Sequence, residues 1–94
     1  MIIVNRAAAH KFMKQHANCR ASLAAWIELV EKAEWKTPVD VKKDFSSASF
    51  LNNNKVIFNI SGNNYRMVVI IIYVNGVLMI DWIGTHAEYS KEKF

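Results

Sequence analysis

The chain has 94 residues, of which 52% are apolar and 21% are charged, and this composition excludes an intrinsically disordered protein. The length is that of one compact domain, so we expect a single domain over residues 1–94. Lysine and arginine exceed the acidic residues and give a net charge of +4, which suits a polyanionic partner such as RNA but does not require one.

The sequence has no pattern typical of a secreted or membrane-spanning protein. Its longest apolar run, residues 67–74, is far shorter than the roughly 20 residues that cross a bilayer. Residues 1–5 have neither the length nor the basic flank of a signal peptide. Cys19 is the single cysteine, so it cannot form an internal disulfide and fits a reducing compartment. We therefore expect a cytoplasmic protein with no membrane partner.

In chain order, the first half of the sequence has the periodicity of two helices. Residues 6–16 are expected to form the first helix, with Asn5 as its cap. Apolar residues at positions i, i+3, i+4 and i+7 predict the second helix, and they are Leu23, Trp26, Ile27 and Val30. This helix should end before Pro38, because proline disfavours helical geometry at the residue that precedes it.

The second half of the sequence has the pattern of strands. Residues 39–54 are rich in serine and asparagine and are expected to be an irregular loop. Three strands and two turns follow; the strands are residues 56–60, 65–74 and 77–83, and the turns are residues 62–63 and 75–76. The sequence therefore predicts an α+β fold, in which two N-terminal helices pack on a small antiparallel β-sheet and a short C-terminal helix or tail follows.

The turn positions fix how the strands pair. With these turns, Asn59 lies opposite Arg66 and Arg66 lies opposite Thr85, so one face of the sheet carries a polar row. A first turn at residues 63–64 would instead remove Asn59 from that row. The opposite face is apolar and should lie under the helices; it consists of Val56, Phe58, Ile60, Tyr65, Met67, Val69, Ile71, Ile80 and Trp82.

The sequence contains no pattern for a metal or a nucleotide cofactor. Its histidines, His10, His16 and His86, lack partners at the intervals that metal ligands require. Its three glycines belong to turns or to a strand end, and none forms part of a phosphate-binding loop. We therefore expect neither a metal nor a cofactor.

Residues 84–89 follow the last strand and bring a histidine, a glutamate and a tyrosine close to the strand of Arg66. RNA can be cut without a metal if a base removes the proton of a 2'-hydroxyl, a cation stabilises the phosphate and an acid protonates the leaving 5'-oxygen. Arg66 suits the cation, because its planar guanidinium can bind phosphate oxygens in pairs. A histidine has an ordinary pKa of about 6.5, so His86 suits the acid or the base. Tyr89 either completes this catalytic set or orients the substrate and stacks on a base.

Each candidate also has an ordinary structural explanation. A strand arginine beside an asparagine is usually a surface charge, and a single histidine near a chain end is usually incidental. The basic residues Lys42, Lys43 and Lys55 are RNA contacts in one interpretation and a solvated face in the other. The three tryptophans, Trp26, Trp35 and Trp82, are expected to fill the core or an interface, and stacking of one of them on RNA is the less favoured alternative. Residue chemistry alone therefore leaves both an enzyme and a non-catalytic binder open.

Two motifs resemble the signature of HigB-type toxins in the RelE-like superfamily. They are VIFNISGNNYR at residues 56–66 and WIGTHAEY at residues 82–89. The helical half is similar too, in LAAW at residues 23–26, EWK at residues 34–36 and DVK at residues 40–42. The resemblance therefore covers nearly the whole chain.

The resemblance implies two helices on a small antiparallel sheet and ribosome-dependent cleavage of translated mRNA. It also implies a cognate antitoxin of the HigA type, which usually carries a helix-turn-helix DNA-binding domain. The functional residues of the family fall first on Arg66 and His86, and then on Asn59, Asn63, Lys55 and Tyr89. A module that only binds RNA, the ribosome or the antitoxin is the alternative on the same scaffold.

One position departs from the pattern of the family. An acidic residue commonly follows the tyrosine, where this chain has Ser90. Glu88 and Asp81 do not follow Tyr89 in the chain, so we expect that neither replaces the missing acid. Either that acid is dispensable here or the activity is weakened.

Overall fold

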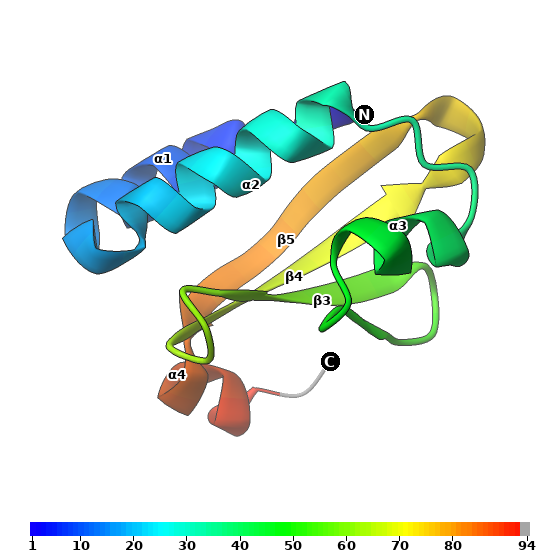
Figure 1. Cartoon of the computed structure of the whole chain (residues 1–94). Coiled ribbons are helices and arrows are strands. Elements are labelled where there is room, and N and C mark those ends of the chain that lie inside the picture. The colour runs from blue at the N-terminus through cyan, green and yellow to red at the C-terminus, as the bar shows by residue number, and fades with distance from the viewer. Residues whose placement is uncertain (93–94) are drawn as a thin grey trace.

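The computed structural model describes residues 1–92 and combines four helices and five strands within that range (Figure 1). The strands are β1 (Ile2–Val4), β2 (Ser49–Phe50), β3 (Lys55–Ile60), β4 (Tyr65–Ile72) and β5 (Val77–Thr85). The helices are α1 (Arg6–Gln15), α2 (Arg20–Lys32), α3 (Pro38–Asp44) and α4 (His86–Lys91), with short 3-10 turns η1 (Ala17–Cys19) and η2 (Tyr73–Asn75). In this part of the chain no helix is both long and apolar enough to cross a membrane.

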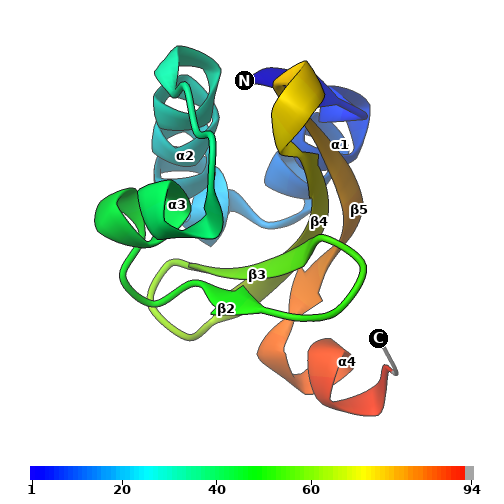
Figure 2. The same cartoon turned by 90° about the vertical axis from the view of Figure 1, so that its right-hand side faces the viewer.

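The five strands form one sheet in the order β1-β5-β4-β3-β2. Strands β2 to β5 pair in antiparallel fashion, and α1 and α2 lie together over one face of the sheet (Figure 2). This confirms the predicted α+β fold, with its N-terminal helices and its short C-terminal helix. Strand β1 was not predicted; it pairs parallel to β5, which makes the sheet mixed.

The core lies between the helices and the sheet. The apolar stripe of α2 is buried as its spacing predicts, with Leu23 and Val30 both 0% exposed. The helices cover alternate residues of the strands; these are Val56, Phe58, Ile60, Met67, Val69, Ile71, Leu78 and Ile80. Burial of so much aliphatic and aromatic surface is the main favourable contribution to folding in a chain of this size.

Asn5 precedes α1 but does not cap it. Its backbone is in the left-handed region, with φ of 69°, and its side chain makes no bond to the first turn of the helix. The Asn5 amide donates instead to the Ile80 carbonyl oxygen at 3.0 Å. The expected cap is therefore wrong, and Asn5 links the start of α1 to β5.

The prediction of an irregular loop over residues 39–54 is also wrong, because α3 and β2 lie there. Helix α3 begins at Pro38, whose fixed φ angle suits a first helical position. The Thr37 hydroxyl accepts from the Asp40 amide and the Asp40 carboxylate accepts from the Thr37 amide, which is a complete capping box. Thr37 and Asp40, three residues apart, are therefore a local signal for the start of a helix, which the serine- and asparagine-rich composition of the segment obscured.

The pairing of β3 with β4 agrees with the sequence, since Asn59 lies opposite Arg66. The predicted pairing of β4 with β5 is wrong for two reasons. The turn is longer than expected, so that Val77 pairs with Ile72. A bulge between Val68 and Val69 then moves the register back by one residue, so that the pairing beyond it differs from the predicted one by a single residue.

This bulge exchanges the faces of the residues that follow it in β5, because side chains alternate along a strand. Arg66 lies opposite Gly84, and Thr85 lies opposite Tyr65. Trp82 pairs with Val68 and therefore leaves the face that the helices cover. The predicted polar row loses Thr85, and the uncovered face gains an indole ring.

Candidate active site

Arg66 lies near the start of β4. Its chain neighbours Tyr65 and Met67 belong to the core under the helices, so the Arg66 side chain lies on the opposite, uncovered face of the sheet. Its strand neighbours are Asn59 on one side and Gly84 on the other. The guanidinium carbon lies 4.6 Å from the centre of the Tyr89 ring, which is cation–π geometry. The Nε atom of Arg66 is buried and has no hydrogen-bond partner among the described residues. A buried donor without an acceptor is costly, and a phosphate oxygen would satisfy it.

The charge of Arg66 is not neutralised within residues 1–92. The ion pairs in this part of the chain join Arg6 to Glu31 and Lys32 to Glu28, and neither involves Arg66. The guanidinium is also held in place, because the aromatic ring of Tyr89 packs against it. An oriented cation of this kind can stabilise the negative charge that develops on a phosphate.

Tyr89 is positioned by the capping box that starts α4. The Thr85 hydroxyl accepts from the Glu88 amide at 3.1 Å, and the Glu88 carboxylate accepts from the Thr85 amide at 2.8 Å. The bond from the Thr85 amide holds the pKa of the Glu88 carboxyl below its ordinary value. The His86 amide also donates to the Asn64 carbonyl oxygen, which joins α4 to the β3–β4 turn. These bonds fix the start of α4, and α4 in turn positions Tyr89 against Arg66.

His86 is the first residue of α4 and is exposed. Asn63 is exposed in the β3–β4 turn, beside the Asn64 carbonyl that holds the backbone of His86. The structure therefore brings Arg66, Asn59, Asn63, His86 and Tyr89 to one end of the sheet, where β3, β4 and α4 meet.

The remaining basic candidates lie elsewhere. Lys55 pairs with Ile70, four residues along β3 from Asn59, which is about 13 Å at the usual rise of a strand. The Lys42 ammonium donates to the Ala48 carbonyl oxygen at 2.6 Å, so it holds the segment between α3 and β2. Lys43 is exposed on α3.

Ser90, the residue that departs from the expected pattern, lies on α4 directly after Tyr89. Its hydroxyl donates to the His86 carbonyl oxygen at 3.1 Å, one helical turn back. Glu88 is occupied by the capping box, and Asp81 is exposed at the β-bulge. That neither carboxylate replaces the missing acid stays a prediction, and the activity of a Glu88→Ala, Asp81→Ala double mutant tests it.

Trp82 is the residue of this corner that sequence reasoning placed on the wrong face of the sheet. It was expected in the core, yet it is only partly buried, and its ring centre lies 6.0 Å from that of Tyr89. The sequence does carry a signal for this position, since the glycine two residues later leaves room for a large side chain on the same face.

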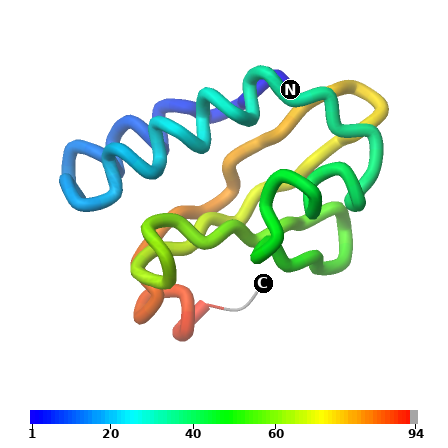
Figure 3. Tube along the Cα trace, in the orientation of Figure 1, coloured from blue at the N-terminus to red at the C-terminus, as the bar shows by residue number. Residues whose placement is uncertain are grey.

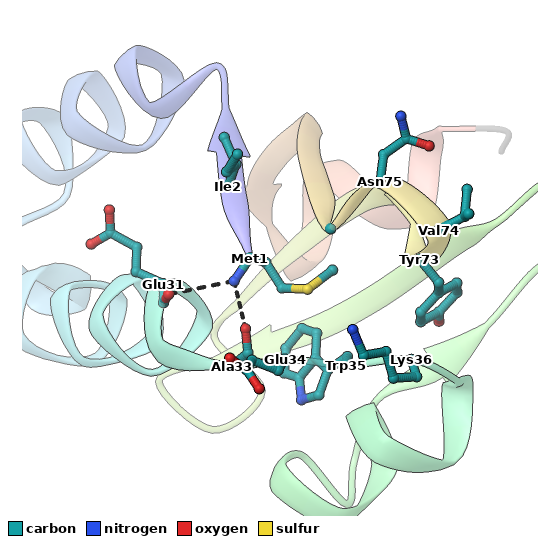
Figure 4. Close-up of a pocket in the computed structure, with 11 residues that line it drawn as sticks. Met1, Ile2, Glu31, Ala33, Glu34, Trp35, Lys36, Tyr73, Val74 and Asn75 are labelled. Atoms are coloured by element: carbon teal, nitrogen blue, oxygen red, sulfur yellow. Dashed lines mark hydrogen bonds between the residues drawn. The ribbon is translucent and has the colours of Figure 1, made fainter.

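The structure contains a hollow of about 430 Å³ near the amino terminus (Figure 4). It lies beside the β4–β5 turn, at the end of β4 away from Arg66. The trace in Figure 3 brings the amino terminus close to this turn, and the Ile2 amide donates to the Gly76 carbonyl oxygen there. The Met1 ammonium donates there to the Val30 and Ala33 carbonyl oxygens. None of the catalytic or RNA-binding candidates lines it, so we place the candidate site at the Arg66 corner. Within residues 1–92 no group of three or more His, Cys, Asp or Glu side chains is arranged to hold a metal ion.

A comparison with protein-family models places residues 19–92 in a family described as the RelE-like toxic component of a toxin-antitoxin system. This match covers most of the chain, including α2 and the whole Arg66 corner. The chain belongs to the HigB toxin family. It is also 26% identical, over 93 residues, to a protein named mRNA interferase HigB from Escherichia coli O6:H1 (strain CFT073). The alignment covers 97% of this chain and 90% of that HigB relative.

Proposed function

We propose that this chain is the toxin of a type II toxin-antitoxin module and acts as an endoribonuclease that cleaves mRNA. The family to which it belongs consists of toxic components, and its relative in Escherichia coli is named an mRNA interferase. The observation that carries the proposal is Arg66, a cation without a carboxylate partner in the described chain, held against Tyr89 with a buried donor available for a phosphate.

The reaction is a transesterification within the RNA. A base removes the proton of a 2'-hydroxyl, the 2'-oxygen bonds to the adjacent phosphorus, and the bond from phosphorus to the 5'-oxygen breaks. An acid then protonates the leaving 5'-oxygen, so that the products end in a 2',3'-cyclic phosphate and a 5'-hydroxyl. No metal is needed for any of these steps. Arg66 stabilises the charge on the phosphate, and His86 donates or accepts a proton.

The remaining candidates would bind the rest of the RNA. Asn59 and Asn63 flank Arg66 at the same end of the sheet and supply amide groups to the backbone or the bases. Lys55, Lys42 and Lys43 lie farther away and would contribute general attraction to the phosphates. Of these, Lys43 is the best placed for such a role, because the Lys42 ammonium already donates to a backbone carbonyl.

We also propose the setting of this reaction. The chain acts in the cytoplasm on mRNA that is bound to the ribosome, and it is neutralised by a helix-turn-helix antitoxin of the HigA type. The support is the family description, which names a toxin-antitoxin system, together with the basic charge of the chain.

The test compares cutting with binding. The variants Arg66→Ala and His86→Ala should abolish mRNA cleavage in a translating extract and retain association with ribosomes, because positioning contacts are spread over many residues. Lys11→Ala is the matched control, since it removes an exposed cation on α1, away from the corner, and should leave cleavage nearly unchanged. Equal loss of cutting and binding in the two corner variants would favour a non-catalytic binder.

A further inference from the structure

Trp82 lies on the uncovered face of the sheet together with Arg66 and Tyr89. A side chain on Gly84 would collide with it, because a Cβ atom there would lie 2.6 Å from Cη2 and Cζ2 of the indole. The ring therefore extends along β5 over Gly84, and Gly84 is the strand partner of Arg66. The glycine thus makes space for a large aromatic ring on the strand next to Arg66, and the centre of that ring lies 6.0 Å from the centre of the Tyr89 ring.

The other two tryptophans are structural in comparison. Trp26 and Trp35 are each 3% exposed and pack against Phe58 in the core. Trp82 is partly exposed, although core packing would bury more apolar surface. A partly exposed indole next to the same Tyr89 ring that contacts Arg66 is therefore better explained by a ligand than by stability.

We infer that Trp82 forms a stacking site for an RNA base next to the phosphate bound by Arg66. This inference rests on the proposed function, because it assigns the base contact of the same RNA. Single-stranded nucleic acids present a phosphate and a flat base one sugar apart, and an arginine beside aromatic rings matches both groups. The positive charge of Arg66, which no carboxylate of the described chain pairs, favours this polyanion over an apolar protein segment as the occupant.

Tryptophan fluorescence tests the inference directly. An oligoribonucleotide with 2'-O-methyl groups cannot undergo the 2'-attack, so it reports binding without cleavage. It should quench the fluorescence of the unmodified chain, and the quenching should disappear in Trp82→Phe. An abasic oligonucleotide of the same length keeps the phosphates and should not quench. Equal quenching by the abasic chain, or none by the complete oligonucleotide, would overturn the base-stacking site.

A pair of variants separates stacking from simple packing. Trp82→Phe keeps an aromatic face and should bind the oligonucleotide within a few-fold of the unmodified chain. Trp82→Leu keeps an apolar side chain but cannot stack, and its affinity should fall about 10-fold or more. Thermal unfolding of both variants shows whether they fold alike. Unchanged affinity in Trp82→Leu would contradict the inference.

The two proposals fail separately. If the methylated oligonucleotide binds and quenches while unmodified mRNA remains uncut, the nuclease proposal fails and the base site stands. If Arg66→Ala abolishes cleavage while Trp82→Leu both cuts and binds normally, the base site fails and the nuclease stands. Quenching by the antitoxin but not by RNA would assign the indole to a protein interface and would overturn the base site.

Discussion

At the scale of single residues, the contact between Arg66 and Tyr89 points to a role for the aromatic ring. The guanidinium lies over the ring face, 4.6 Å from its centre. Tyr89→Phe keeps that face, so we expect it to cleave mRNA within a few-fold of the unmodified rate. Tyr89→Ala removes the face and should lose roughly 10-fold or more, since misplaced catalytic groups are costly. Single-turnover cleavage rates check this, and a Phe variant as inactive as Ala would instead make the phenol itself the proton donor.

Arg66 itself allows a test of geometry against charge. Arg66→Lys keeps the positive charge but loses the planar group that packs on Tyr89 and binds phosphate in pairs. We expect its cleavage rate to lie between those of the unmodified chain and Arg66→Ala, with the alanine variant reduced about 100-fold or more. A lysine variant as active as the arginine would show that charge alone suffices.

Glu88 predicts a pH dependence of α4. Its pKa is lowered by the bond from the Thr85 amide, so the ionised carboxylate stabilises the start of the helix. The stabilisation is complete above the ordinary pKa of 4.5 and is lost as the pH falls through the lower value of the folded chain. The amide resonance of Thr85 should therefore shift below pH 4.5 in the unmodified chain and not in Glu88→Gln. The same shift in both chains would assign the titration to another group.

At the scale of elements, the helices and turns that depend on local sequence patterns could be predicted. The α2 stripe and the turn before Tyr65 each carry their information within a few residues, and both agree with the structure. The β4–β5 register depends on a bulge, and no short sequence motif predicts that bulge. The bulge places Trp82 on the same face of the sheet as Arg66. Arg66, His86 and Tyr89 could therefore be predicted as candidates from the sequence, whereas the position of Trp82 on the face of Arg66 could not.

Helix α3 offers a prediction at the same scale. Its capping box depends on the Thr37 hydroxyl, which accepts from the Asp40 amide. Thr37→Val removes that acceptor and keeps the shape of the side chain, so it should lower the free energy of unfolding by about 1 kcal/mol. Thr37→Ser retains the hydroxyl and should cost less. Urea unfolding measures both, and equal losses would contradict the capping role.

At the scale of the whole molecule, α2 packs on the sheet through its buried stripe. Leu23 is 0% exposed, so Leu23→Ala should lower the free energy of unfolding by about 2–5 kcal/mol. Leu29, on the same helix, is 38% exposed, so Leu29→Ala should cost much less. Urea unfolding compares the two, and similar losses would contradict this assignment of the core.

The chemistry of the RNA ends tests the central claim most directly. Purified chain is added to a translating extract, and the ends of the cut mRNA are compared with those from His86→Ala and Arg66→Ala. We expect a 2',3'-cyclic phosphate on one side of each cut, a 5'-hydroxyl on the other, and no cuts from either variant. Ends with a 3'-hydroxyl and a 5'-phosphate, or cuts that persist in both variants, would contradict a metal-independent nuclease built on Arg66 and His86.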